Sequence, residues 1–307
     1  MSRTDGSPTG RTDGSGAART DGGRQARTEE APARWAESRP TTGEDGSPRS
    51  LLEIADLAVT YPGGVRAVDG VSLAVEPGAA LVLLGESGSG KTTVARTVLG
   101  LPGRGARVTG RIRLAGTELT ALDERALSRV RERRIGYVPQ DPTASLDPLR
   151  RIGPQLAEVL RRHRIADGRR MVADEVARLL TTAGIPDPDR VARAYPHELS
   201  GGLRQRAAIA IAIACGPELL IADEPTTALD ALVRVRILDL FATLRATCGI
   251  ALLLVTHDLA AARRISGDVA VMRQGRVVEA GPAERVLTAP VHTFTAALLA
   301  ADPGARR

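Results

Sequence analysis

Aromatic side chains are scarce in this sequence of 307 residues. Phenylalanine, tryptophan and tyrosine make up 2% of it, and the single tryptophan, Trp35, lies near the amino terminus. Proteins that bind single-stranded nucleic acid without sequence preference stack the bases on aromatic rings. With so few rings available, we expect no nucleic-acid partner.

Cysteines and long apolar runs are also few. The two cysteines, Cys215 and Cys248, stand in apolar surroundings, which indicates buried thiols in a reducing compartment rather than a disulfide framework or a zinc site. The longest apolar run, Ala207–Cys215, is much shorter than the ~20 residues of a membrane-spanning helix. We therefore expect neither a transmembrane span nor a signal peptide.

Lysine is the scarcest charged residue. The chain has 42 basic and 36 acidic residues, a formal charge of +6, and Lys91 is its only lysine. A mild basic excess suits an anionic nucleotide, and equally an acidic lipid surface or nucleic acid. Because an ammonium is a compact point charge and a guanidinium a planar fork, a lone lysine among arginines marks a position where the compact charge is needed.

That lysine lies in the segment Gly85–Thr92, which fits the phosphate-binding pattern G-x-x-x-x-G-K-[ST]. An apolar run, Ala80–Leu84, leads into it as a buried strand, and a helical pattern over Thr93–Leu99 follows. Such a loop wraps backbone N–H groups around phosphate oxygens at the positive end of a helix. We expect Lys91 to contact the β- and γ-phosphates of a nucleotide and the Thr92 hydroxyl to bind Mg²⁺. The alternative, a chance Gly/Ser-rich turn, is disfavoured by the flanking strand and helix.

A phosphate loop needs a second, acidic site for its metal ion and its water, and two adjacent carboxylates supply it. The apolar segment Leu219–Ala222 reads as a buried strand and ends in Asp223 and Glu224. We expect Asp223 to hold Mg²⁺ directly or through water, and Glu224 to polarise the water that attacks the γ-phosphate. The alternative is that these adjacent acids at a strand end are ordinary surface residues.

The rest of the chain divides into regions of different character. Residues 1–50 repeat Arg-Thr-Asp-Gly with hardly any apolar side chains, and we expect a disordered tail; a docking arm is the alternative. Apolar strands alternating with helices predict a parallel sheet covered on both faces. Residues 141–198 carry helical patterns with Pro-rich joints and predict an inserted helical subdomain. We expect the ATPase domain to span residues 51–281 and residues 282–307 to be a C-terminal extension.

Several further motifs resemble those of ATP-binding cassette (ABC) proteins. Leu199-Ser200-Gly201-Gly202 is similar to the family's signature sequence, while its glutamine, Asp-containing and histidine loops resemble, in the same order, Pro139-Gln140, Thr227-Ala228-Leu229-Asp230 and Thr256-His257-Asp258. Each motif alone is weak, but the ordered set is specific. The resemblance implies an α/β phosphate-loop ATPase core of mostly parallel strands with helices on both faces, an N-terminal antiparallel β subdomain and an inserted helical subdomain.

The resemblance also implies a role for each matching residue, with ATP and Mg²⁺ as ligands. The signature of one subunit closes over the ATP of a second, in a head-to-tail pair with Asp230 at the seam. Gln140 contacts Mg²⁺ and water, and His257 holds the γ-phosphate and Glu224 in line. The expected catalytic residues are Glu224, His257 and Gln140; those expected to bind nucleotide are Tyr61 (by stacking on adenine), Gly85, Glu86, Ser87, Gly88, Ser89, Gly90, Lys91, Thr92, Thr93, Ser200, Gly201, Gly202 and Asp230; those expected to bind Mg²⁺ are Thr92, Gln140 and Asp223.

Two longer stretches resemble the oligopeptide, dipeptide and nickel importers: Gln140–Pro148, and the late Gly281-Pro282 with Pro290–Thr295. This implies an ATPase subunit at the cytoplasmic face of the membrane, which drives import of a peptide-like or metal-type solute through separate permease subunits. A second ABC ATPase subunit and an extracellular or periplasmic substrate-binding protein complete such a system. The alternative is a non-transport ABC ATPase acting in DNA repair or on ribosomes, although the interval between Lys91 and Ser200 leaves room only for the helical subdomain.

A permease helix would need a docking edge on the helical subdomain. Leu146, Leu149 and Ile152, beside Arg150 and Arg151, are candidates because such contacts combine apolar anchors with flanking charge. The same three apolar residues fit the subdomain's own core equally well.

Overall fold

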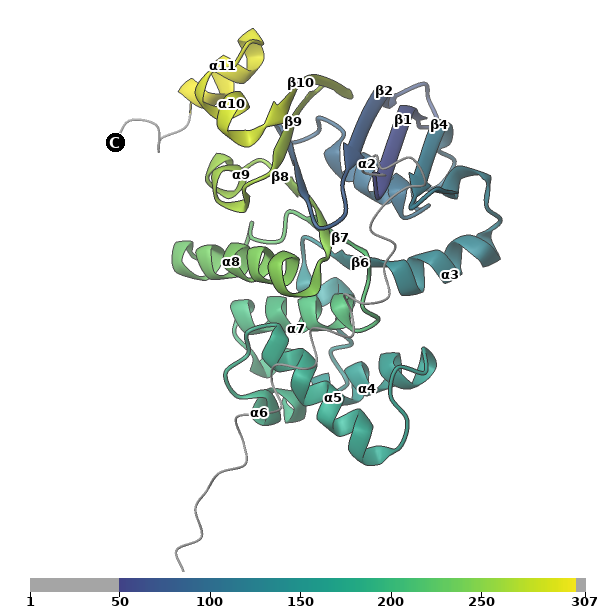
Figure 1. Ribbon diagram of the computed structural model, residues 1–307, viewed down its shortest axis with the longest axis vertical. Helices are drawn as coiled ribbons and strands as arrows, with labels where there is room; N and C mark the ends of the chain where they lie inside the picture. The colour runs from purple at the N-terminus through teal and green to yellow at the C-terminus, as the bar shows by residue number, and fades with distance from the viewer. Residues whose placement is uncertain (1–49, 302–307) are drawn as a thin grey trace, which may run out of the picture.

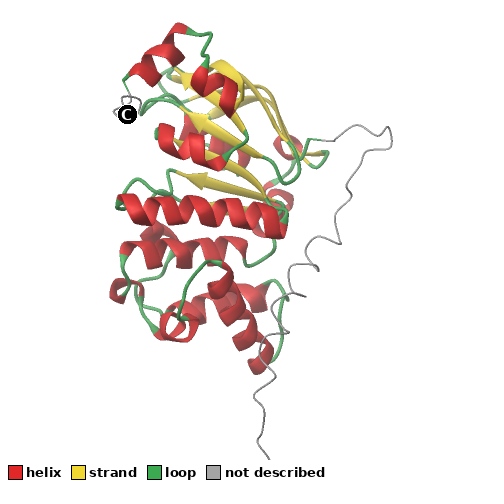
Figure 2. Ribbon diagram, turned by 60° about the vertical axis from the view of Figure 1, so that its left-hand side comes forward, coloured by secondary structure: helices red, strands yellow, loops and turns green. Residues whose placement is uncertain are grey.

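Two β-sheets occupy one half of the molecule and helices alone fill the opposite end (Figures 1 and 2). The computed structural model describes residues 50–301. The predicted tail, apart from Ser50, and residues 302–307 of the predicted extension lie outside the described residues. Among the helices of residues 50–301, none is both long enough and apolar enough to cross a bilayer.

The larger sheet is the predicted parallel one. Its strands are β3 (Ala80–Leu84), β6 (Ile135–Val138), β7 (Leu219–Asp223), β8 (Ala251–Thr256), β9 (Asp268–Arg273) and β10 (Arg276–Pro282). They lie in the order β10-β9-β3-β8-β7-β6, all parallel except β10, which pairs antiparallel with β9. Strands β3, β7 and β8 are buried along their whole length, which explains their continuous apolar sequences.

The second sheet is the predicted antiparallel β subdomain. It comprises β1 (Leu52–Thr60), β2 (Arg66–Val75), β4 (Arg107–Leu114) and the short β5 (Thr117–Glu118), in the order β2-β1-β4-β5. The β1–β4 pairing shifts register at Asp56, which has a φ of 50°. Gly110 lies opposite, where an added Cβ would come within 2.4 Å of the Asp56 carbonyl oxygen, so this bulge requires glycine.

Helices cover both faces of the parallel sheet. They are α2 (Lys91–Val98), α3 (Glu124–Arg134), α7 (Gly201–Ile213), α8 (Ala231–Cys248), α9 (Leu259–Ile265), α10 (Ala283–Thr288) and α11 (Thr293–Ala300). Alternate residues of β3 show the two layers: Ala80, Val82 and Leu84 belong to one apolar core, and Leu81 and Leu83 to the other. The first core contains α7, α8 and α9, and the second contains α2 and the antiparallel sheet.

The remaining helices form a lobe at the end of the molecule away from the antiparallel sheet (Figure 1). Helices α4 (Ile152–Arg162), α5 (Arg169–Thr182) and α6 (Pro188–Arg193) pack against one another, and α4 and α5 also pack against α7. The sequence indicated only a Pro-rich joint where α6 lies. This short helix begins at Pro188 after an Asp187 cap, an arrangement that suits proline at the first helical position.

Of the three residues predicted as a docking edge for this lobe, two belong to its core, as the alternative interpretation had it. Leu146 and Ile152 are buried in the lobe's core, and only Leu149 is exposed, at 85%. The helical pattern of α4 explains the error, because Ile152 begins the same apolar face as Leu156 and Leu160.

Candidate active site

The predicted polar residues follow the carboxyl ends of four neighbouring strands. Strands β3, β8, β7 and β6 are adjacent and parallel, so their carboxyl ends share one edge of the sheet. At that edge lie the phosphate loop after β3, His257 after β8, Asp223 and Glu224 at the end of β7, and Gln140 after β6.

The phosphate loop joins β3 to α2 in a conformation that requires glycine. Gly90 caps α2 with a φ of 101°, and an added Cβ would lie 2.3 Å from the Ala67 carbonyl oxygen. Lys91 is only 4% exposed, and its Nζ donates to the carbonyl oxygens of Gly85 and Glu86, each at 2.8 Å. Burial lowers the pKa of Lys91, and the nearby carboxylates oppose that shift. A buried ammonium inside a loop at a helix N-terminus favours an anion.

Thr92 and Asp223 come together as predicted for a metal site. The Thr92 hydroxyl donates to Oδ1 of Asp223 at 2.9 Å, and the Tyr137 hydroxyl lies 3.3 Å from Oδ2. Burial raises the pKa of Asp223, while these hydroxyl groups oppose the shift. A hydroxyl and a carboxylate beside a phosphate loop fit Mg²⁺, which takes oxygen ligands and completes its shell with phosphates and water. Residues 50–301 contain no cluster of three or more His, Cys, Asp or Glu suited to a metal.

Glu224 contacts side chains from three segments. Nδ1 of His257 lies 3.2 Å from its Oε1, and Oε2 accepts hydrogen bonds from the Thr227 hydroxyl at 3.0 Å and from Nε2 of Gln140 at 3.4 Å. Glu224 has a φ of 46°. This backbone conformation is strained for any residue other than glycine and is typical of functional sites. The three predicted catalytic residues therefore form one cluster.

Tyr137 and Thr227 were not among the predicted site residues. Tyr137 lies next to the end of β6, and strand adjacency to Asp223 was its only sequence signal. Thr227 belongs to the Asp-containing motif. Its position three residues after Glu224 was the sequence signal for their contact.

The other predicted residues lie around this centre or at helix starts. The Tyr61 ring packs on the core beneath the antiparallel sheet, and its hydroxyl donates to the Pro102 carbonyl oxygen at 2.7 Å. Ser200 caps α7 and Asp230 caps α8. Helix α7 packs on β6, α4, α5 and α8, whereas α2 packs on β2, β7 and β8. The signature residues thus start a helix on a different side of the sheet from the phosphate loop.

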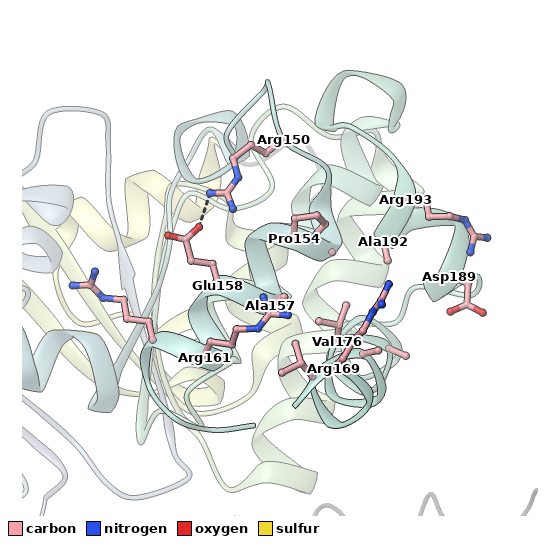
Figure 3. A pocket seen from close by; sticks show the side chains of 15 residues that line it. Arg150, Pro154, Ala157, Glu158, Arg161, Arg169, Val176, Asp189, Ala192 and Arg193 are labelled. Atoms are coloured by element: carbon pink, nitrogen blue, oxygen red, sulfur yellow. Dashed lines mark hydrogen bonds and ion pairs between the residues drawn. The ribbon is translucent and has the colours of Figure 1, made fainter. Parts of the chain in front are cut away.

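A separate groove of about 1260 Å³ lies in the helical lobe between α4, α5 and α6. Pro154, Ala157, Val176 and Ala192 line it together with several arginines, as Figure 3 shows. The Arg150–Glu158 ion pair, 2.5 Å long, stands at one side. The remaining lining arginines are Arg161, Arg162, Arg169 and Arg193, and the other lining acid is Asp189.

Known proteins with similar sequences are transport ATP-binding proteins. Residues 68–227 match the model of the ABC transporter family. An oligopeptide transport ATP-binding protein, OppD, of Mycobacterium bovis is 44% identical over 256 residues, which cover 82% of this chain but 42% of that protein. A putative peptide import ATP-binding protein of Brucella ovis is 44% identical over 267 residues, which cover 84% of this chain and 79% of that protein. The chain thus spans less than half the length of the first of these relatives.

Solved structures of ATP-binding cassettes have the same fold. The dimeric post-hydrolysis state of the cassette MJ0796, bound to ADP and Pi, is 28% identical with a TM-score of 0.67, covering 76% of this chain and 99% of that one. CbiO1 from Clostridium perfringens, part of an ABC transporter complex, is 26% identical with a TM-score of 0.69, covering 78% and 91%. On the sequence match, the fold and the arrangement of its motifs, the chain belongs to the ABC transporter family.

Proposed function

We propose that this chain binds and hydrolyses ATP and thereby energises peptide import through separate membrane subunits. The observation that carries the proposal is the cluster of Glu224, His257 and Gln140 next to the buried Lys91 and the Thr92–Asp223 pair. A carboxylate beside a phosphate loop that contains a buried lysine is suited to promote attack of water on a terminal phosphate.

In this proposal the phosphate loop binds the nucleotide. Lys91 exchanges its contacts with the Gly85 and Glu86 carbonyl oxygens for contacts with the β- and γ-phosphates, because charge-assisted bonds to phosphate are stronger. Thr92, Asp223 and Gln140 hold Mg²⁺, which neutralises phosphate charge when bound. The Tyr61 ring stacks on adenine.

Glu224 takes the proton of the attacking water in this scheme. Thr227 and Gln140 orient its carboxylate through their hydrogen bonds to Oε2. His257 lies against the other oxygen and contacts the γ-phosphate, so that the carboxylate and the phosphorus stay in line. Positioning of this kind supplies most of the catalysis in phosphoryl transfer.

A second ABC subunit completes each ATP site. Ser200, Gly201 and Gly202 begin α7 on a different side of the sheet from the phosphate loop. Their N–H groups at the helix N-terminus suit a phosphate, and a head-to-tail partner brings them to the γ-phosphate, with Asp230 at the seam.

Permease subunits and a substrate-binding protein outside the membrane are the remaining partners in this proposal. The chain lies at the cytoplasmic face of the membrane and receives a permease helix in the groove of α4, α5 and α6, whose apolar floor and charged rim suit an amphipathic helix. The relatives described above are an oligopeptide transport and a putative peptide import ATP-binding protein, which supports a peptide as cargo.

ATP hydrolysis and peptide uptake test the proposal together. Purified wild-type protein should release phosphate from ATP only with Mg²⁺ present, and Lys91→Ala should lose tight ATP binding in calorimetry while remaining folded by circular dichroism. A strain lacking the gene should lose uptake of a labelled oligopeptide, and only the wild-type gene should restore it. Hydrolysis by Lys91→Ala at the wild-type rate contradicts the ATP site, and undiminished uptake in the strain contradicts the transport role.

A further inference from the structure

An ion pair joins helix α8 to the histidine segment. Nη1 of Arg234 lies 3.1 Å from Oδ2 of Asp258, the residue after His257. Arg234 lies in the first turns of α8, and its backbone N–H donates to the carbonyl oxygen of Asp230 at 2.9 Å. The pair therefore connects the start of α8, where Asp230 lies, with the segment that carries His257.

Hydrogen bonds hold Asp258 in addition to its ion pair with Arg234. Its N–H donates to the Thr256 hydroxyl at 2.9 Å, and its Oδ1 accepts a bond from the Ala260 N–H at 2.8 Å, which caps α9. Thr256 is fixed in the sheet opposite Leu84, the residue before the phosphate loop. His257 thus lies between a residue fixed by the sheet and one whose remaining carboxylate oxygen is fixed by Arg234.

Stability alone does not explain this ion pair. Its side chains are 37% and 20% exposed, and ion pairs exposed to this degree contribute little to stability. Nε of Arg234 is buried without a hydrogen-bond partner in the described part of the chain, which costs free energy. A second, bidentate pair, Arg264–Asp239 at 2.6 and 2.8 Å, joins α9 to α8 farther from the site.

We propose that Arg234 is a positioning residue for His257. Through Asp258 it sets the placement of the imidazole against the Glu224 carboxylate, and it makes that placement depend on the start of α8. When the second subunit displaces Asp230, His257, which holds the γ-phosphate in the proposed function, therefore moves as well. This inference rests on the proposed ATPase function.

The experiment compares Arg234→Ala with Arg264→Ala, which removes the matching distal ion pair between the same helices. Arg234→Ala should lower kcat for ATP hydrolysis by roughly tenfold, because a displaced catalytic group costs rate, and it should leave KM for ATP within about twofold since the phosphate loop is untouched. Arg264→Ala should keep the wild-type kcat. Arg234→Lys keeps a cation for Asp258 and should recover part of the loss.

Two further measurements keep the result decisive. Asp258→Asn retains a side-chain cap for α9 but loses the ion pair, so it should show the same roughly tenfold loss of kcat and replaces Arg234→Ala as the test if that variant fails to fold. The imidazole NMR signal of His257, assigned with His257→Gln, should shift in Arg234→Ala and not in Arg264→Ala without any ATP. Equal kcat in the two arginine variants, or a wild-type kcat in Asp258→Asn, overturns the inference. If the wild-type protein hydrolyses no ATP, the proposed function fails, while the His257 signal still tests the link.

Discussion

At the scale of single residues, Glu224 combines a strained backbone with a carboxylate shared among several side chains. Its N–H is held by the Val255 carbonyl oxygen at 2.8 Å in the neighbouring strand, so the sheet stabilises the left-handed conformation. In this backbone conformation the carboxylate contacts His257, Thr227 and Gln140. We expect the rate of hydrolysis to depend both on this orientation and on the ability of the carboxylate to accept a proton.

Glu224→Gln should lower kcat for ATP hydrolysis by more than about 100-fold, because an amide cannot accept the proton of the attacking water. ATP binding measured by calorimetry should stay within a fewfold of wild type. Glu218→Gln is the control, since it makes the same chemical change just before β7 at the opposite end of that strand, where Glu218 pairs with Arg134. A Glu224→Gln protein with wild-type turnover assigns the base to another residue.

The residues around Glu224 show how far sequence reasoning extends at this scale. Lys91, Thr92 and Asp223 were predictable because each stands at a fixed place in a strand–loop–helix pattern, and the structure brings Thr92 and Asp223 into contact. The contact of Tyr137 with Asp223 depends on the order of strands in the sheet. Local patterns contain no information on that order, so this neighbour was missed.

At the scale of elements, Glu279 in β10 anchors the segment that leads into α11. Its Oε1 accepts from the Val291 N–H at 2.9 Å and its Oε2 from the His292 N–H at 3.1 Å. Burial raises the pKa of this carboxyl, but the backbone hydrogen bonds from these residues, together with the Thr295 hydroxyl and the positive charge of Arg285, outweigh it and hold the pKa below its ordinary value. The charged form is therefore the one that fixes the C-terminal helices.

Glu279→Gln should lower the free energy of unfolding by about 1 kcal/mol at pH 7, since hydrogen bonds to a charged group are lost or weakened. A lowered folded-state pKa means that this stabilisation is present above the ordinary value of 4.5 and is lost as the pH falls through the folded-state pKa. Urea unfolding of both proteins from pH 7 to pH 3 should show the difference shrinking. Glu284→Gln, an exposed change in α10, is the control, and an equal effect there contradicts the anchor.

The arginines around the groove of the helical lobe form a second feature at this scale. Arg169→Glu with Arg193→Glu should abolish peptide uptake and spare basal ATPase activity and folding, because charge reversal at the rim opposes the proposed permease helix. Arg170→Glu is the matched control on α5, since Arg170 does not line the groove. Normal uptake by the double variant places the permease contact elsewhere.

Elements with strong local signals were predictable, and short ones were not. Asp123, a residue type favoured at this position, caps α3 by accepting a bond from the Ala126 N–H at 2.7 Å. Helix α9 was not predicted. It has only seven residues, too few for a clear helical period, and its stability comes from the burial of Leu259, Ala262 and Ile265 in the core.

At the scale of the whole molecule, the positions of α2 and α7 require two chains for one complete site in the proposed function. The parallel sheet itself was predictable from apolar strands alternating with helices. The domain boundaries at residues 51, 141, 198 and 281 stay predictions. How two copies meet was implied only by family resemblance, because no interface can be derived from one chain's periodicity.

Mixing two inactive variants tests the head-to-tail arrangement. Lys91→Ala and Ser200→Arg should each abolish hydrolysis alone, the first by losing phosphate binding and the second by obstructing the start of α7. A mixed dimer then contains one site with both changes and one intact site, so mixing should restore about a quarter of wild-type activity if the sites are independent. Failure of the mixture to gain activity, with mixed dimers shown by differential tags, contradicts the arrangement.

The single lysine has a consequence for the chemistry of the folded chain. Its amine is buried and already engaged by two loop carbonyl oxygens, and no other ε-amine exists in the sequence. Acylating reagents and amine-directed cross-linkers therefore have no accessible lysine to react with on the native protein. Only opening of the phosphate loop makes an ε-amine available, so acylation of this chain at lysine records loss of structure at the nucleotide site itself.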